Sequence, residues 1–162
     1  MSKFEKLQPW IGLLSRLTLG GVLFVAGYLK VDKLDISQMA VRSYELLPIP
    51  IANFLGLTLP FFEVVIGLLL ILGAATRFVA ALGGFTMFIF IIAIAQAWAR
   101  GLNIDCGCFG GGGTVDPGQT RYLQEILRDA GLVVLALFLV RYPITKFSID
   151  KTPKQSNAGD TE

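Results

Sequence analysis

Two cysteines, Cys106 and Cys108, are the residues whose type and spacing most directly suggest chemistry, and a single glycine separates them. A disulfide requires Cα atoms about 4.4–6.8 Å apart, so residues two positions apart can be bridged only where the chain bends. Gly107 permits such a bend because it lacks a Cβ atom. Closing so small a ring adds little stability, and strained disulfides belong to the easily reduced, exchange-active class. The spacing therefore favours redox exchange by this pair.

The residues around the cysteines favour contact with a partner. Phe109 supplies an apolar tip, and Gly110 begins a run of four glycines that we expect to act as a flexible hinge. Gly107, Phe109 and Gly110 are therefore the expected docking loop. A nucleophilic cysteine needs a nearby cation to stabilise its thiolate, and Arg100 and Arg121 are the nearest cations in sequence.

Two other interpretations of the cysteine pair stay open. The first is a pair of free thiols, or an inert disulfide, in a loop. The second is metal binding, since soft thiolates suit Cu(I) or zinc, but the chain offers two such ligands and a partner would have to complete the site. An iron–sulfur cluster held by this chain alone would lack two ligands. We therefore assign no metal site.

The absence of histidine narrows the chemistry further. It excludes imidazole acid–base catalysis, a serine–histidine–aspartate triad, and haem or zinc held by imidazole. The net charge is +2, and the basic residues form no cluster of the kind that binds a phosphate backbone. Nucleic acid is therefore not an expected partner.

The composition places these residues in a membrane protein. Hydrophobic residues make up 54% of the chain and charged residues 16%, against about 45–50% and about 25% in ordinary globular domains. Crossing a hydrocarbon core of about 30 Å takes about 20 largely apolar residues. Four segments qualify, approximately residues 10–29, 51–75, 78–99 and 120–142. We expect an all-α, integral membrane four-helix bundle over residues 1–147, followed by a disordered cytoplasmic tail over residues 148–162.

A shorter segment between the first two spans, residues 35–47, has apolar residues at helical spacing beside charged ones. This pattern predicts a short amphipathic helix that lies on the membrane surface. An even number of spans puts both termini on one side, and the distribution of lysine and arginine favours the cytoplasm for that side. The loop of residues 101–119, which carries the cysteines, then faces outward, where disulfides form and are exchanged.

Ionisable residues inside the expected spans need partners, because a charge at membrane depth costs about 2.5–3.5 kcal/mol on insertion scales. Arg16 and Glu63 both lie on small-residue faces of their helices, where transmembrane helices approach closely, so we expect them to form an ion pair. Lys30 is expected to approach Asp129, with Arg128 as a competing partner. Such pairs either fix the helix register or take part in proton movement or substrate binding.

Several motifs of the chain resemble the MauE branch of the MauE/DoxX membrane proteins. The most specific is the Cys-Gly-Cys-Phe-Gly run at residues 106–110, which follows the third apolar helix and precedes the Arg-Asp pair at residues 128–129. Looser features, shared across the DoxX-like group, are Arg16, Leu17, Gly20, Gly27 to Lys30, Leu47, Pro48, Pro60, Glu63, Gly67, Gly73 and Arg77. The resemblance covers roughly residues 10–142.

The resemblance implies a bacterial inner-membrane protein of four helices that takes part in thiol redox chemistry together with a thioredoxin-like partner. Members that function in methylamine utilisation are associated with disulfide formation in a dehydrogenase subunit. The resemblance implies that Cys106 and Cys108 are the active pair. It also implies supporting roles for four polar residues, Lys30, Glu63, Arg128 and Asp129.

The leading hypothesis is a membrane thiol–disulfide redox protein that supports disulfide formation or maturation of exported proteins, with the two cysteines as candidate catalytic residues. Membrane enzymes that form disulfides and reduce quinone typically relay electrons through a second cysteine pair, and this chain has one pair. We therefore expect exchange with the thioredoxin-like partner, with a quinone between the helices as an optional acceptor rather than a required cofactor. The alternatives are a non-enzymatic assembly or scaffold subunit of a membrane complex, and a small-solute transporter built around Glu63 and Arg16.

Overall fold

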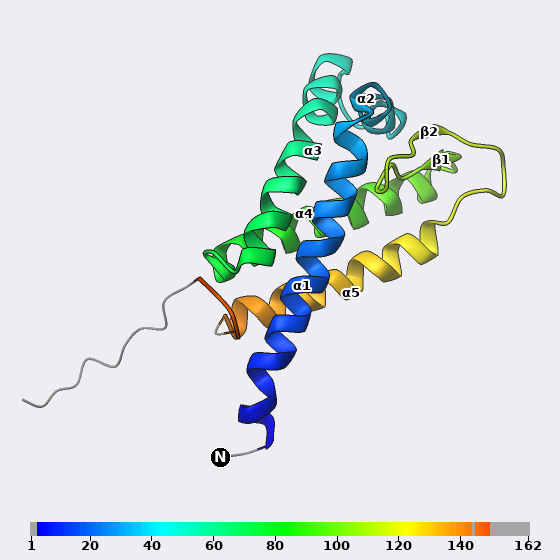
Figure 1. The fold of residues 1–162 in the computed structure, drawn as a ribbon. Coiled ribbons are helices and arrows are strands. Elements are labelled where there is room, and N and C mark those ends of the chain that lie inside the picture. The colour runs from blue at the N-terminus through cyan, green and yellow to red at the C-terminus, as the bar shows by residue number, and fades with distance from the viewer. Residues whose placement is uncertain (1–2, 144, 150–162) are drawn as a thin grey trace, which may run out of the picture.

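The computed structural model describes residues 3–143 and 145–149, which form helices and one short β-hairpin (Figure 1). The elements in chain order are α1 (Lys3–Val31), α2 (Leu34–Ser43), α3 (Ile49–Leu72), α4 (Thr76–Ala99), β1 (Ile104–Asp105), β2 (Gly113–Thr114) and α5 (Tyr122–Arg141). The expected all-α class is confirmed, and the hairpin lies in the loop that carries the cysteines.

Helices α1 and α3 pack against each other along their length, because small residues bring their backbones together. A Cβ atom added at Gly20 would lie 3.0 Å from the Gly67 carbonyl oxygen, and one added at Gly27 would lie 2.6 Å from the Pro60 carbonyl oxygen. Such close approach is typical of helix pairs in membranes. These contacts also fix the register of the antiparallel pair, with position 20 opposite position 67 and position 27 opposite position 60.

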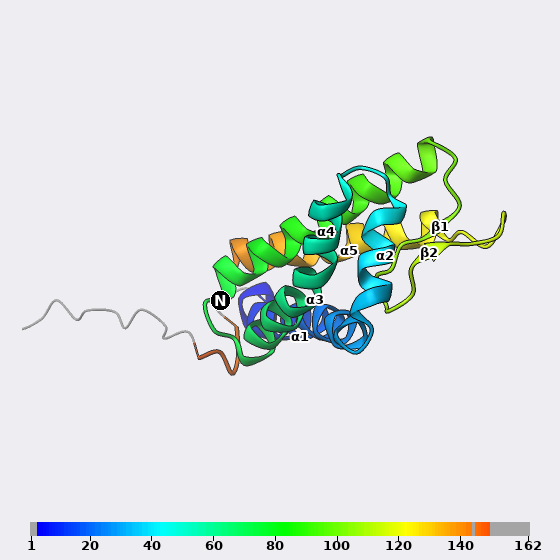
Figure 2. The same ribbon diagram turned by 90° about the horizontal axis from the view of Figure 1, so that it is seen from above.

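Helices α4 and α5 form a second antiparallel pair, which crosses the first pair obliquely (Figures 1 and 2). The two pairs enclose one apolar core, in which a Cβ atom added at Gly84 would lie 2.7 Å from the Ala136 Cβ atom. Its buried members come from α1, α3, α4 and α5: Leu19, Leu23, Ile66, Leu70, Val79, Ala80, Met87, Leu132, Ala136 and Leu139.

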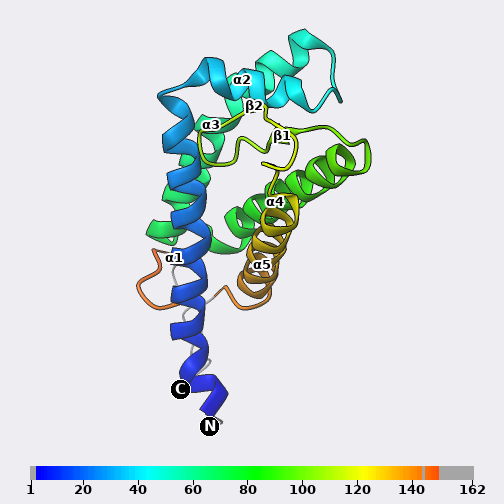
Figure 3. The ribbon, with the colours of Figure 1, turned by 90° about the vertical axis from the view of Figure 1, so that its right-hand side faces the viewer.

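The short helix expected between the first two spans is α2, which ends at Ser43, before the expected residue 47. It lies across the end of α1 and the beginning of α3, beside the hairpin (Figure 3). The contact with α3 is tight, since a Cβ atom added at Gly56 would lie 2.5 Å from the Gln38 Cα atom. Helix α2 thereby forms one wall of the region that holds the cysteine loop.

Three of the described helices are long and apolar enough to cross a membrane: α3, α4 and residues 7–31 of α1. Helix α5 is not among them, because Glu125, Arg128 and Asp129 interrupt its first half.

The outer face of α4 exposes large apolar side chains at a spacing of seven residues, with Phe78 at 66% and Phe85 at 62% exposure. An apolar face of this extent suits lipid rather than water. The chain is therefore a multi-pass membrane protein in contact with the bilayer.

The two ends of the described chain differ in detail from the sequence expectation. Helix α1 begins at Lys3 and includes Pro9, whereas the first span was expected from residue 10. After α5, Ser148 and Ile149 both donate hydrogen bonds to the Gly73 carbonyl oxygen, at 2.8 Å and 3.1 Å. The rest of the expected tail, residues 150–162, lies outside the described residues.

Candidate functional site

The Cys-Gly-Cys segment lies in the loop of the β-hairpin that connects α4 to α5. The strands β1 and β2 pair antiparallel, with Ile104 opposite Thr114. The hydroxyl of Tyr122, at the start of α5, accepts a hydrogen bond from the Ile104 amide at 3.0 Å and donates one to the Leu102 carbonyl oxygen at 2.5 Å. These bonds attach the hairpin to the first turn of α5 and so place the cysteines beside that helix.

A tight turn at Gly107 brings the two sulfurs together. The Asp105 Oδ1 atom accepts a hydrogen bond from the Gly107 amide at 2.8 Å, as aspartates commonly do in turns. Gly107 has φ of +71°, a conformation that favours glycine. The Cys108 amide donates to the Cys106 Sγ atom at 3.2 Å, and the two thiols share a hydrogen bond. Both cysteines are free thiols, held close to each other by the turn.

The glycines of the loop allow it to lie directly on α2. A Cβ atom added at Gly107 would come within 2.6 Å of the Ala40 Cβ atom, and one added at Gly112 within 2.5 Å of the same atom. Ala40 itself is buried. The loop is thus packed against a helix, which differs from the flexible hinge that the glycine run suggested.

Two side chains of α5, Glu125 and Arg128, interact with the two sulfurs from the opposite side. Glu125 lies beside Cys106 at the wall of one pocket. Arg128 lines the same small cavity as Cys108, and its guanidinium lies 4.9 Å from the centre of the Phe109 ring. Each cysteine therefore has its own charged neighbour, a carboxylate for Cys106 and a guanidinium for Cys108.

The cation beside the cysteines differs from the sequence expectation. Arg100 is half exposed and forms a surface ion pair with Glu45 at 3.1 Å. Arg121 lines the same pocket as Cys106, but the guanidinium that interacts with a sulfur is that of Arg128. The expectation of Arg100 or Arg121 is therefore corrected. The reason is that α5 turns back along the hairpin and brings its second turn, rather than its first residue, beside the cysteines.

The surroundings of Cys106 favour its protonated form. The hydrogen bond to the Cys108 thiol, followed by burial and by the charge of a Cys108 thiolate, raises the pKa of Cys106. Burial likewise raises the pKa of Tyr44, whose hydroxyl donates a hydrogen bond to the Cys106 carbonyl oxygen at 3.1 Å.

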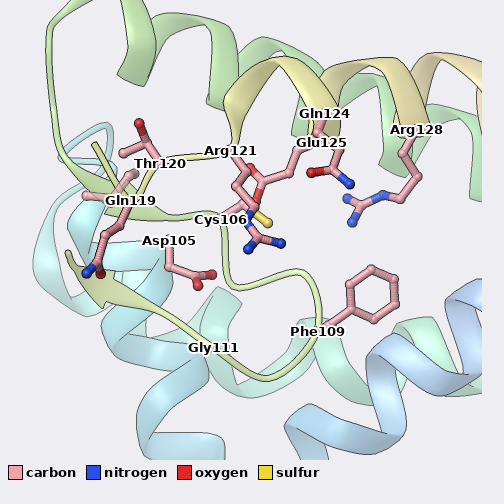
Figure 4. A pocket seen from close by; sticks show the side chains of 11 residues that line it. Asp105, Cys106, Phe109, Gly111, Gln119, Thr120, Arg121, Gln124, Glu125 and Arg128 are labelled. Carbon is pink, nitrogen blue, oxygen red and sulfur yellow. The ribbon is translucent and has the colours of Figure 1, made fainter. Parts of the chain in front are cut away.

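A pocket of about 600 Å³ opens on the Cys106 side of the loop (Figure 4). Its wall combines Asp105, Cys106 and Phe109 from the hairpin with Glu125 and Arg128 from α5 and with Arg121, which precedes that helix. Cys106 is half-buried and lines this pocket, whereas Cys108 is 6% exposed and does not. A molecule that enters the pocket therefore meets the Cys106 sulfur first.

Behind the loop, Cys108 lines a small internal cavity together with Glu63 and Asp129. Its volume is about 10 Å³, the space of roughly one water molecule. The Glu63 carboxylate is fully buried, and both of its oxygens accept hydrogen bonds from Lys30 Nζ, at 2.9 Å and 2.8 Å. A cavity of this volume is too small for an organic solute.

The expected ion pair between Arg16 and Glu63 is wrong, because Glu63 pairs with Lys30. The register of α1 against α3 explains the difference. Arg16 lies beside Gly73, ten residues beyond Glu63, which corresponds to about 15 Å along a helix. The Arg16 guanidinium instead donates to the Thr145 hydroxyl at 2.8 Å and to the Phe147 carbonyl oxygen at 3.1 Å. Arg16 therefore secures the segment after α5 and lies far from the cysteines.

The expected pair of Lys30 with Asp129 is also replaced, in this case by the competing partner. Arg128 Nη2 lies 2.7 Å from Asp129 Oδ1, and Asp129 is fully buried. Its second oxygen has no hydrogen-bond partner within the described part of the chain. Lys30, Glu63, Arg128 and Asp129 are nevertheless close neighbours, since the last three line the small cavity behind Cys108 and Lys30 binds Glu63.

Sequence reasoning missed three residues of the site, Glu125, Tyr44 and Tyr122. The signal for Glu125 was present, because positions 125, 128 and 129 share one face of a helix at spacings of three and four residues. The tyrosines carried no such signal. Their hydroxyls bind backbone carbonyls of the hairpin from segments distant in sequence, and this packing is visible only in the folded chain.

Comparison with known proteins agrees with these features. The family model described as "Methylamine utilisation protein MauE" matches residues 8–142, which include α1 from residue 8 onward, the other three long helices, the cysteine loop and the Arg-Asp pair of α5. No curated protein sequence and no solved structure matches the chain significantly. Because the family model covers most of the chain, the protein belongs to the MauE family.

Proposed function

We propose that this protein is a membrane thiol–disulfide exchange protein whose Cys106 and Cys108 cycle between the dithiol and the disulfide. The observation that carries the proposal is the turn at Gly107, which holds the two cysteines together, with Arg128 lining the same small cavity as Cys108. A cation beside one cysteine of a close pair is the usual means of favouring the thiolate that exchange requires.

The different exposure of the sulfurs suggests a role for each. Cys106 lines the open pocket, so we assign it the mixed disulfide with the partner. Cys108 is buried behind it and next to Arg128, so we assign it the resolving role. When a partner thiolate attacks the Cys106 sulfur of the disulfide, Cys108 leaves as a thiolate that the guanidinium stabilises. The partner is oxidised by two electrons when its second thiolate releases Cys106.

The partner that we propose is an extracytoplasmic thioredoxin-like protein, and the membrane is the bacterial inner membrane. Helix α5 has 20 residues, which at about 1.5 Å per residue gives about 30 Å and matches a hydrocarbon core. We therefore propose that α5 is the fourth span, so that the termini lie together in the cytoplasm. The hairpin, attached to the other end of α5 by Tyr122, then faces outward.

A scaffold subunit is the rival function, and it differs in what it requires of the cysteines. If the chain only holds a membrane complex together, the double variant Cys106→Ser/Cys108→Ser should support that complex as well as the wild type does. If it exchanges disulfides, the same variant should lose function while the protein stays folded in the membrane. Abundance and detergent-resistant folding of the variant provide the control.

The direct test is thiol labelling of intact cells with a membrane-impermeant maleimide, before and after a mild reductant. We expect Cys106 and Cys108 to be labelled only after reduction, which indicates an outward-facing, reducible disulfide. Immediate labelling would mean outward-facing free thiols and would count against a resting disulfide. Labelling that requires permeabilised membranes would overturn the proposed orientation and, with it, the extracytoplasmic partner.

A further inference from the structure

We propose that Glu125 is a catalytic residue of this site, acting as the base that takes the proton from the Cys106 thiol and as the acid that returns it. The inference rests on the proposed exchange function and adds a proton-transfer group to the pair of sulfurs. It assigns a role to a residue of α5 outside the Arg-Asp pair.

The position of Glu125 suits direct proton transfer. Its carboxylate lies beside the Cys106 thiol at the wall of the pocket, which places a proton acceptor next to the donor. Figure 4 shows the two side chains meeting at one wall of the pocket. The Glu125 Oε2 atom is buried and has no hydrogen-bond partner among the described residues, which leaves a second oxygen able to accept a proton.

The two sulfurs have neighbours of opposite charge, so Arg128 and Glu125 have different roles. Arg128 pairs with Asp129 and lines the same small cavity as Cys108, so its positive charge lies beside the inner sulfur. Glu125 contacts the outer sulfur, where a negative carboxylate cannot stabilise a thiolate by charge. A carboxylate at that place can promote reaction only by removing the proton.

Cys106 needs such an acceptor, because its environment favours the thiol. The pKa of Cys106 is raised by its hydrogen bond to Cys108, by burial and by the second sulfur. At neutral pH the outer cysteine is therefore almost entirely protonated, and spontaneous ionisation would limit its rate of attack. A contacting carboxylate removes this limit because it accepts the proton as the sulfur attacks.

The step in the direction of partner reduction is balanced as follows. The Cys106 proton moves to Glu125 while the Cys106 sulfur attacks one sulfur of a partner disulfide. A new S–S bond forms, the partner S–S bond breaks, and the second partner sulfur leaves as a thiolate. The Cys108 thiol gives its proton to the partner thiolate that has left, its sulfur attacks Cys106, and the first partner sulfur is released as a thiolate. The protein loses two electrons and two protons to the partner, Glu125 returns its proton to a departing thiolate, and the reverse direction uses the same groups.

Several other charged or titratable groups surround this carboxylate and must be considered in any pH profile. They come from α5, from the hairpin and from the residue that follows α2: Arg121, Arg128, Asp129, Asp105, Cys106 and Tyr44. Cys108 completes the set and is removed by substitution in the test.

The test uses the full chain in detergent micelles with Cys108→Ser, so that Cys106 is the single remaining thiol. An uncharged organic disulfide, 2,2′-dithiodipyridine, serves as the probe, and its coloured leaving group reports the rate of attack between pH 6 and pH 9. We expect Glu125→Gln to slow the reaction at pH 7 on the order of 100-fold, as is usual when a positioned base is lost. The slowed reaction should then rise steadily with pH over the whole range.

A carboxylate that is only a neighbour predicts the opposite sign. Its negative charge repels the thiolate, so Glu125→Gln would then leave the rate unchanged or raise it, and either result would overturn the proposal. Glu45→Gln is the matched control, because it removes one carboxylate from an exposed site that is 63% accessible and pairs with Arg100. We expect this control to react at the rate of the parent.

A second variant covers the case in which Glu125→Gln does not fold. Glu125→Asp keeps the charge but withdraws the carboxylate by one methylene, so we expect a rate between those of the parent and the Gln variant. An unchanged rate in Glu125→Asp would contradict a contacting base. These measurements need no physiological partner. Their outcome therefore tests the role of Glu125 alone, whereas the proposed function is refuted if the cysteines do not cycle between dithiol and disulfide in cells.

Discussion

The buried pair of Lys30 and Glu63 is the interaction whose removal should affect stability most. Lys30 is 4% and Glu63 0% exposed, and Lys30 Nζ lies 2.8 Å from Glu63 Oε2. Removing one partner of a buried pair leaves an uncompensated charge and typically costs about 3–5 kcal/mol. We expect Glu63→Gln to lower the free energy of unfolding by about this amount. Lys30→Met/Glu63→Gln removes both charges and should lose less than Glu63→Gln alone.

The assay is a double-mutant cycle on reversible unfolding in mixed micelles, followed by circular dichroism. A comparison cycle combines Glu63→Gln with Arg16→Met, whose effects should add within about 0.5 kcal/mol because Arg16 lies beside Gly73, ten residues from Glu63 along α3. Strong coupling of Glu63 to Lys30, with none to Arg16, is the expected pattern. Additive effects for Lys30 and Glu63, or equal coupling to Arg16, would refute the register of α1 against α3 on which the account depends.

Three further predictions concern the loop, the C-terminal segment and the reactive thiol. Gly112→Ala should push the loop away from Ala40, because the added methyl group has no room and φ is +151°; we expect faster maleimide labelling of the reduced cysteines. Arg16→Met should release the segment after α5, which limited proteolysis would detect as earlier cleavage there. Cys108→Ser removes the main cause of the raised pKa of Cys106, so alkylation of Cys106 by iodoacetamide should begin at a lower pH than in the reduced wild type.

The helices and the cysteine turn could be predicted from the sequence because their causes are local. Long apolar runs predict α1, α3 and α4, and Gly107 between two cysteines predicts the bend that the structure contains. The family was likewise indicated by short motifs and is confirmed over residues 8–142. These features depend on neighbouring residues in the chain rather than on tertiary packing.

The pairing of charges could not be predicted because it depends on the helix register. The position of α1 along α3 decides whether Arg16 or Lys30 meets Glu63, and the contacts at Gly20 and Gly27 set that register. The cation beside the cysteines was missed for a similar reason. Distance in sequence favoured Arg100, whereas the return of α5 along the hairpin brings in Arg128.

The central claim is that Cys106 exchanges disulfides with a partner while Cys108 resolves the intermediate, and mixed-disulfide trapping tests it most directly. Cells that carry the full chain with Cys108→Ser are quenched with acid and separated without reductant, with Cys106→Ser as the matched variant. We predict a reductant-sensitive adduct in Cys108→Ser, with peptide mass spectrometry locating the link at Cys106, and little adduct in Cys106→Ser. An adduct formed mainly through Cys108, or none in either variant, would contradict the account.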